Sequence, residues 1–289
     1  MENAFLDRLK LPAPAKINHF LHITGRRADG YHLLQTLFQF LDYSDDIELI
    51  VRDDGVISRP HGHADIPEQD DLVVKAAKLL QSKTACPLGA EIKVHKRLPM
   101  GGGLGGGSSD AATVLLGLNL LWGCGLSEKQ LAALGLELGA DVPVFVYGRA
   151  AWAEGVGEQL EFVDLPSKWY LVVHPGVHIS TAKIFAHEGL TRDLRPITIA
   201  SFLAGQTQNV FETVAKEVFS EVDNAHKWLS NFAVTKMTGS GACLFAEFET
   251  KNQAQQILSK LPAQWSGFIA RSDFRSPLHV KLDSIVKSV

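Results

Sequence analysis

The chain has 289 residues, of which 46% are hydrophobic and 21% are charged, as in an ordinary globular protein with a buried core. Its formal net charge of -4 at pH 7 disfavours nucleic acid and anionic membranes as partners, because both repel an acidic surface. No apolar stretch approaches the roughly 20 residues that cross a bilayer, and the first residues lack the pattern of a secretory signal. The three cysteines have no metal-site or redox spacing. We therefore expect a cytoplasmic protein with reduced thiols.

Strand and helix patterns alternate along the N-terminal part of the chain. Alternating side chains predict strands, and apolar residues at helical spacing predict a helix. These patterns give strands at residues 16–23, 32–41, 47–51 and 92–94, and a helix at residues 71–80. Asp29-Gly30 is typical of a hairpin turn and predicts that the first two strands are neighbours.

The remainder of the chain continues in the same mixed manner. Ser127 and Gln130 form a capping box, which predicts a helix through residue 138. Helices are also expected at residues 111–122, 180–187 and 222–229, and strands at residues 142–147, 169–174 and 242–248. Because strands and helices interleave without a clean βαβ rhythm, the pattern favours an α+β fold. The pattern breaks at residues 164–168, which predicts two domains, 1–164 and 165–289.

The most informative segment is a loop at residues 101–107, where six of seven positions are glycine. So many glycines are costly in backbone entropy, but they leave a row of unobstructed N–H donors. Ser108 and Ser109 follow and are good caps for the next helix. Because a helix N-terminus carries partial positive charge and unpaired N–H groups, the loop and the helix together predict a phosphate site.

Three other interpretations of this loop are weaker. A Walker A loop would need a lysine where Ser108 stands. Gly101, Gly103 and Gly106 satisfy the dinucleotide fingerprint G-x-G-x-x-G, but the acidic residue expected about 20 positions later is missing. A purely structural turn hardly explains so many glycines. The remaining interpretation is a phosphate-binding loop of another kind than these.

Three motifs together resemble the GHMP kinase superfamily. Residues 99–109 resemble its phosphate loop, residues 14–18 (Pro-Ala-Lys-Ile-Asn) its first motif, and residues 237–243 (Met-Thr-Gly-Ser-Gly-Ala-Cys) its second glycine turn. The resemblance implies a two-domain α+β fold with the active site in the cleft between the domains. It also implies that residues 1–164 form the ATP-binding domain and residues 165–289 the C-terminal GHMP kinase domain.

Further segments resemble one group within the superfamily. They are residues 24–32, 37–39, 139–143 and 153–157. Members of that group use ATP and Mg²⁺ to phosphorylate the 2-hydroxyl of a cytidine diphosphate-linked methylerythritol, in the non-mevalonate route to isoprenoid precursors. A GHMP kinase for another small alcohol, such as homoserine, is the nearest alternative. A dinucleotide-dependent oxidoreductase and a non-catalytic nucleotide-binding module are more distant ones.

The resemblance assigns catalysis to Lys16 and Asp141. Asp141 stands among small and apolar residues, where burying a carboxylate without a partner is expensive. It would accept the proton of the substrate hydroxyl, and Lys16 would favour the ionised carboxylate. By spacing alone Asp141 reads as a residue of a helix-terminal turn and Lys16 as a solvated charge, so both assignments depend on the resemblance.

The remaining site residues also follow from the resemblance. Tyr31, His32 and Phe185 would form a cytosine pocket, in which two aromatic rings can sandwich the base; Asn18 and Thr181 would line the substrate site. ATP would be held by Lys96, Pro99, Met100, Gly101, Gly102, Gly103, Leu104, Gly105, Gly106, Gly107, Ser108 and Ser109. Mg²⁺ ligands are not assigned, and Asp110 is a candidate by position only. Asp71 stands where the family commonly has asparagine near the adenine, and His19 replaces a usual apolar residue.

Overall fold

The structure, a computed structural model, describes residues 6–62, 66–205 and 207–287. Within these residues the strands form a ten-stranded sheet, in which β3, β4, β2, β10, β7, β9 and β8 follow one another, while β1 and β5 also pair with β2 and β6 pairs with β5. The strands are β1 (Arg8–Arg26), β2 (His32–Arg52), β3 (Ile57–His61), β4 (Gly89–His95), β5 (Ala151–Glu154), β6 (Gln159–Phe162), β7 (Trp169–His174), β8 (Thr235–Met237), β9 (Leu244–Phe248) and β10 (Ser266–Asp273).

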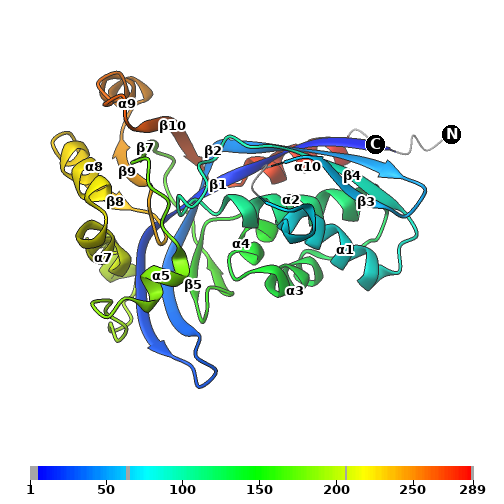
Figure 1. Cartoon of the computed structure of the whole chain (residues 1–289), viewed down its shortest axis with the longest axis horizontal. Helices are drawn as coiled ribbons and strands as arrows, with labels where there is room; N and C mark the ends of the chain where they lie inside the picture. The colour runs from blue at the N-terminus through cyan, green and yellow to red at the C-terminus, as the bar shows by residue number, and fades with distance from the viewer. Residues whose placement is uncertain (1–5, 63–65, 206, 288–289) are drawn as a thin grey trace.

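Helices flank this sheet at both ends of the molecule (Figure 1). They are α1 (Leu72–Thr84), α2 (Gly106–Leu121), α3 (Glu128–Leu138), α4 (Val142–Tyr147), α5 (Thr181–Ala186), α6 (Ile199–Leu203), α7 (Val210–Val218), α8 (Ser220–Ser230), α9 (Lys251–Leu258) and α10 (Pro277–Val286). The predicted α+β class is therefore confirmed. None of the described helices is long and apolar enough to cross a membrane.

A long antiparallel hairpin, β1 with β2, connects the two ends of the molecule (Figure 1). The strands predicted at residues 32–41 and 47–51 are parts of the single strand β2. Pairing runs from Arg8↔Ile50 to Arg26↔His32, and irregularities interrupt its register, one of them between Asn18 and Leu21. Such an irregularity changes the face to which the following side chains point, so one strand serves different surroundings along its length.

Two main hydrophobic cores lie at opposite ends of the hairpin. The first combines α1 to α4 with β1, β2 and β4, and it includes Leu278 of α10. The second combines α7 and α8 with β7 to β9, and it includes Leu21 and Ile23 of β1. Thus β1 contributes to both cores, and α10 returns from the chain end to the first. The boundary between residues 164 and 165 stays a prediction.

Two local predictions were wrong. Residues 142–147 form the helix α4 and not a strand. Five of its six residues are buried, on every side of the helix, so the sequence Val-Pro-Val-Phe-Val-Tyr shows no period that distinguishes helix from strand. Ser108 and Ser109 do not cap α2, because the helix already begins at Gly106 after Gly105, which has φ 73° and provides no side-chain cap.

Candidate active site

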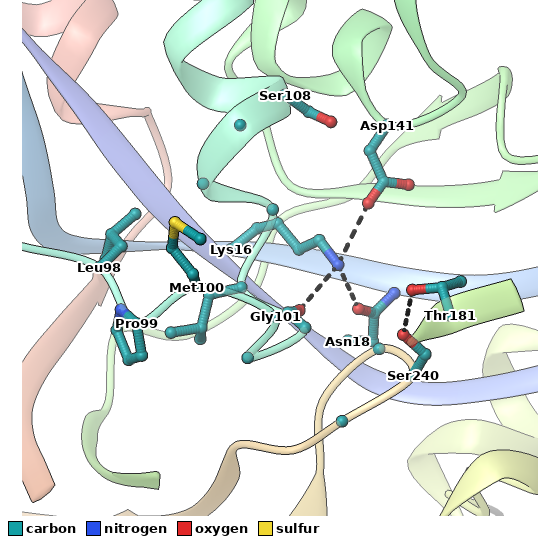
Figure 2. Close-up of a pocket in the computed structure, with 18 of the residues that line it drawn as sticks. Lys16, Asn18, Leu98, Pro99, Met100, Gly101, Ser108, Asp141, Thr181 and Ser240 are labelled. Atoms are coloured by element: carbon teal, nitrogen blue, oxygen red, sulfur yellow. Dashed lines mark hydrogen bonds and ion pairs between the residues drawn. The ribbon is translucent and has the colours of Figure 1, made fainter. Parts of the chain in front are cut away.

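A cavity of about 480 Å³ collects the three sequence motifs (Figure 2). Lys16 and Asn18 enter it from β1, the loop 101–107 covers one wall, and the turn 239–241 lies beside the loop. Asp141 enters from the junction of α3 and α4. Of the predicted residues, the cavity is lined by Lys16, Asn18, Lys96, Pro99, Met100, Gly101, Gly102, Gly103, Leu104, Gly105, Gly106, Gly107, Ser108, Asp141, Thr181 and Phe185.

Lys16 is the buried centre of this site. Its Nζ lies 2.6 Å from Asn18 Oδ1, 3.1 Å from the carbonyl oxygen of Gly103 and 3.3 Å from Asp141 Oδ2 (Figure 2). A buried ammonium is tolerated only when such oxygen partners replace its water. The three oxygens come from β1, the glycine loop and the start of α4, so the ammonium joins three separate parts of the chain.

Asp141 is more open than its partner, since 37% of its side chain is exposed against 4% for Lys16. It precedes α4 as the N-cap residue, but its side chain makes no capping hydrogen bond. The carboxylate is thereby left to contact Lys16 on one side and the cavity on the other. This is the arrangement expected of a group that must reach a bound alcohol.

Asn18 is held by a network of buried hydroxyl groups. Its Nδ2 donates to Thr36 Oγ1 at 2.9 Å, and its backbone N–H donates to Thr238 Oγ1 at 3.0 Å. The Thr36 hydroxyl in turn donates to the carbonyl oxygen of Phe20. This fixes the amide with Oδ1 toward Lys16, so Asn18 orients the ammonium. Its predicted contact with substrate stays a prediction.

The glycine loop and the second glycine turn interlock. The backbone N–H groups of Ala242 and Cys243 donate to the carbonyl oxygens of Gly101 and Gly102, each at 3.1 Å. Gly103 has φ 73°, and a Cβ there would lie 2.1 Å from the Thr238 carbonyl oxygen. Close backbone packing therefore requires a glycine at this position, so part of the glycine content has a structural cause.

Gly106 and Gly107 differ from the glycines before them. They open α2, and the nearest atoms to an added Cβ would lie at 3.4 Å and 3.5 Å, an ordinary contact distance. The N–H groups of the first helical turn have no intrahelical acceptor, and the residues of this turn line the cavity through Ser108. Ser109 is fully buried and lies outside the cavity lining. The helix start thus provides the anion-binding geometry expected from the sequence.

Lys96 lies at the cavity edge between two carboxylates. Its Nζ pairs with Asp45 Oδ2 and, at 2.7 Å, with Asp110 Oδ2. Burial raises the pKa of the Asp110 carboxyl to about 7; Lys96 opposes this shift and Asp45 adds to it. Burial lowers the pKa of Lys96, but the two carboxylates outweigh it and leave that pKa raised. The ammonium predicted to hold ATP is therefore already charge-balanced by the protein.

The aromatic residues predicted for a cytosine pocket lie beside the cavity. Tyr31 is 65% exposed in the hairpin turn, and neither Tyr31 nor His32 lines the cavity. The ring of His32 stacks on Phe185, with centroids 5.1 Å apart and planes inclined by 28°. Phe185 also meets Phe211 edge to face at 4.7 Å. His32, and not Tyr31, therefore covers the face of Phe185 in this structure.

Several cavity residues were missing from the predicted set. The Ser240 hydroxyl lies 2.8 Å from that of Thr181 (Figure 2), and its place in the motif 237–243 is a signal that could have identified it. No sequence pattern identified Thr36, because it belongs to an ordinary strand segment and only the fold brings it next to Asn18. Asp71 caps α1 through the backbone N–H of Val73 and lies 3.2 Å from Arg59, so here its carboxylate contacts protein groups.

Comparisons with known proteins identify the family of the chain. The model of the GHMP kinases N terminal domain matches residues 71–149, and that of the GHMP kinases C terminal domain matches residues 186–267. A 4-diphosphocytidyl-2-C-methyl-D-erythritol kinase of Alkalilimnicola ehrlichii is 59% identical over 260 residues, which is 90% of this chain and 89% of the relative. The chain belongs to this kinase family. The relative from Nitrosococcus oceani, with the same name, is 56% identical over 90% of this chain and 93% of its own length.

Solved structures extend the similarity to the whole fold. A crystal structure of a 4-(cytidine 5'-diphospho)-2C-methyl-D-erythritol kinase is 32% identical, with a TM-score of 0.78 over 91% of this chain and 99% of that one. The homoserine kinase of Cytophaga hutchinsonii is 18% identical, with a TM-score of 0.72 over 96% of this chain and 98% of its own. At that identity the second similarity concerns the fold alone. The GHMP kinase fold and the family predicted from the motifs are confirmed.

Proposed function

We propose that the protein transfers the γ-phosphate of ATP to the 2-hydroxyl of 4-diphosphocytidyl-2-C-methyl-D-erythritol, a step of the non-mevalonate route to isoprenoid precursors. The observation that carries this proposal is the 3.3 Å ion pair between Lys16 and Asp141, beside the glycine loop in one cavity. Membership of the kinase family supplies the identity of the alcohol. The cytoplasmic location expected from the sequence stays part of the proposal.

In this reaction the start of α2 binds the phosphates of ATP. The N–H groups of Gly106, Gly107 and Ser108 belong to the unpaired first turn of the helix, and the helix dipole favours negative charge there. Lys96 faces the same region, although Asp45 and Asp110 share its charge. We infer that backbone N–H groups contribute more to phosphate binding than this lysine does.

Asp141 and Lys16 act on the substrate alcohol. The substrate oxygen forms a bond to the γ-phosphorus, the bond from that phosphorus to the β–γ bridging oxygen breaks, and ADP leaves. The hydroxyl proton passes to the Asp141 carboxylate, while the Lys16 ammonium orients this carboxylate and counters negative charge at the reacting oxygens. Because phosphoryl transfer has a loose transition state, positioning and charge neutralisation contribute more than base strength.

Mg²⁺ would enter with the nucleotide. Among the described residues there is no cluster of three or more His, Cys, Asp or Glu side chains suited to a metal, but Mg²⁺ on phosphates needs only one or two protein carboxylates. Asp110 fits, because it lines the cavity and its Oδ1 is buried with no hydrogen-bond partner in the described part of the chain. Mg²⁺ bound there would neutralise charge on the phosphates.

The cytidine end of the substrate would bind at Phe185. The His32 ring occupies the face of Phe185, so a cytosine base could stack there only after this ring moves aside. Tyr31 is exposed in the adjacent turn and could then cover the other face of the base. Stacking on aromatic rings is worth about 1–3 kcal/mol per base, which would favour the exchange.

The test is an ADP-release assay with three alcohols side by side: the cytidylyl-methylerythritol substrate, homoserine and mevalonate. We expect ADP release above background only with the first. Release with homoserine or mevalonate alone would overturn the substrate assignment. ADP release that is independent of any alcohol would instead indicate an ATPase.

A further inference from the structure

A second cavity, of about 650 Å³, lies behind strand β1. Leu21 lines the active-site cavity, whereas His22, the next residue of the strand, lines the second one. Successive side chains of a strand point to opposite faces, so the two cavities are on opposite sides of β1. No step proposed for phosphoryl transfer uses the residues of this second cavity.

Two cations of this cavity have no carboxylate partner. Arg195 and Lys236 both line it, and within the described chain neither lies within 4.0 Å of an acidic oxygen. The cavity contains one described carboxylate, that of Glu212. Its Oε1 already pairs with Lys216 and His226, each at 3.1 Å, and its Oε2 accepts the Met237 N–H at 2.9 Å. Neither cation therefore has an ion-pair partner in the described chain, although Glu247 and Glu212 act on the Lys236 ammonium from farther away.

His22 adds an unused polar group to the wall. The residue is 6% exposed, and its Nδ1 is buried with no hydrogen-bond partner among the described residues. A buried ring nitrogen without a partner is costly unless a ligand or water completes it. Because Nδ1 is covered in this conformation, a phosphate oxygen in the cavity could reach it only after the ring turns.

The wall that carries Arg195 is fixed in place. The backbone N–H of Leu194 donates to the carbonyl oxygen of Ile23 at 3.0 Å. The side chain of Gln35 forms two hydrogen bonds with the backbone of Ile197, at 2.8 Å and 3.0 Å. The backbone on both sides of Arg195 is thus tied to the β1–β2 hairpin, while its side chain is exposed.

The other lining side chains suggest the rest of the ligand. Leu194, Ile197 and Val234 are apolar and line the same cavity as the cations. An inorganic anion would leave these side chains without a contact, whereas an alkyl group would cover them. We propose that this cavity binds a small alkyl phosphate, with Arg195, Lys236 and His22 around the phosphate and the apolar side chains around the alkyl group.

Titration calorimetry on the protein saturated with ADP would test this proposal, since ADP fills the glycine loop. The probes are butyl phosphate and inorganic phosphate. We expect one butyl phosphate site, with binding at least about tenfold tighter than that of inorganic phosphate because several methylene groups are buried. Arg195→Met and Lys236→Met should each weaken butyl phosphate binding about tenfold, the effect of losing one charge-assisted hydrogen bond.

Lys227→Met is the matched control, because Lys227 is exposed and paired with Asp223 on α8. It should bind butyl phosphate like the unchanged protein. Since Arg195 is exposed, its variant tests the site even if Lys236→Met fails to fold. Equal affinity in all variants, equal affinity for the two probes, or no saturable binding below about 10 mM would overturn the proposal. The measurement needs no turnover, so its outcome does not depend on phosphoryl transfer to any alcohol.

Discussion

The Lys16 ammonium lies 3.3 Å from the Asp141 carboxylate and 3.1 Å from the carbonyl oxygen of Gly103. One cation thus connects the proposed proton acceptor to the phosphate loop. Because its side chain is buried, neither solvent nor another lysine can replace it easily.

We expect Asp141→Asn and Lys16→Met each to lower kcat by about 10²–10⁴-fold, the usual range for a positioned proton acceptor and its partner. Lys10→Met is the matched control on the same strand, since Lys10 is exposed and 3.9 Å from its nearest carboxylate, Asp46. Initial rates of ADP release with the cytidylyl-methylerythritol substrate measure the effect. Near-native turnover in either site variant would remove that residue from the mechanism.

The interlocked glycine turns make a second prediction. Gly103→Ala would place a methyl group 2.1 Å from the Thr238 carbonyl oxygen at φ 73°, so the two turns must separate. Gly123→Ala is the matched control, because Gly123 has φ 64° and no atom within 4 Å of an added Cβ. The control should lose about 1–2 kcal/mol of unfolding free energy through backbone strain alone, and Gly103→Ala clearly more.

Denaturant unfolding of both variants measures this difference, and ADP release shows whether activity follows it. Gly123→Ala should keep its activity, since the residue lies outside the cavity lining. Equal destabilisation of the two variants would mean that the contact between the turns contributes nothing to stability.

His19 predicts a dependence of stability on pH. Burial lowers its pKa to about 4, against the partly opposing hydrogen bond of its Nε2 with Gln39 at 2.6 Å. The unfolded chain takes up the proton below the ordinary pKa of 6.5, whereas the folded chain does so only near pH 4, so stability falls as pH decreases between these values. Between pH 7 and pH 5 this one residue should cost about 2 kcal/mol.

His19→Leu should remove that dependence, and Gln39 keeps the Tyr170 hydroxyl as a donor at 3.0 Å. The comparison uses denaturant unfolding of both proteins at the two pH values. The quantity compared is the difference in unfolding free energy between the two proteins at each pH, because Asp110 acts in the opposite direction. The pKa of Asp110 is about 7 in the folded chain against an ordinary 3.8, so its contribution to stability falls as pH rises between these values. Identical pH profiles would show that His19 is not the titrating group.

The proposed binding place of the cytosine base depends on Phe185. We expect Phe185→Ala to raise KM for the cytidylyl substrate about tenfold, as the loss of one stacking contact predicts, with little change in kcat. Phe274→Ala is a suitable control, because Phe274 is 51% exposed and does not line the cavity. A fall in kcat at unchanged KM would point to a role for Phe185 in the chemical step.

The local chemistry of the site was predictable from the sequence, but its long-range partners were not. The glycine loop around Gly103 indicated a phosphate site by itself, whereas Lys16 and the turn at residues 237–243 were recognised only through the family resemblance of the three motifs together. The pairing of Lys96 with Asp45 depends on how β2 approaches the segment after β4, which no local pattern encodes. The same holds for the contact of Thr36 with Asn18.

Element types were predictable wherever the side chains showed a period. The capping box of Ser127 and Gln130 is confirmed, and so is the strand predicted at residues 16–23, although all eight of its residues are buried and show no alternation in burial. The strand predicted at residues 142–147 was wrong because a helix that is apolar on all sides resembles a buried strand in sequence. The predicted serine cap of α2 was wrong because Gly105 precedes the first helical residue, although serine is the commoner cap.

Strand β1 is continuous from Arg8 to Arg26 and supplies buried side chains at both ends of the molecule. If one end of the molecule unfolded alone, apolar side chains of β1 would be exposed while the rest of the strand stayed packed in the other core. In addition, Leu278 of α10 packs in the first core, so the last part of the chain contacts the first. Heating should therefore give a single calorimetric peak, with equal calorimetric and van't Hoff enthalpies.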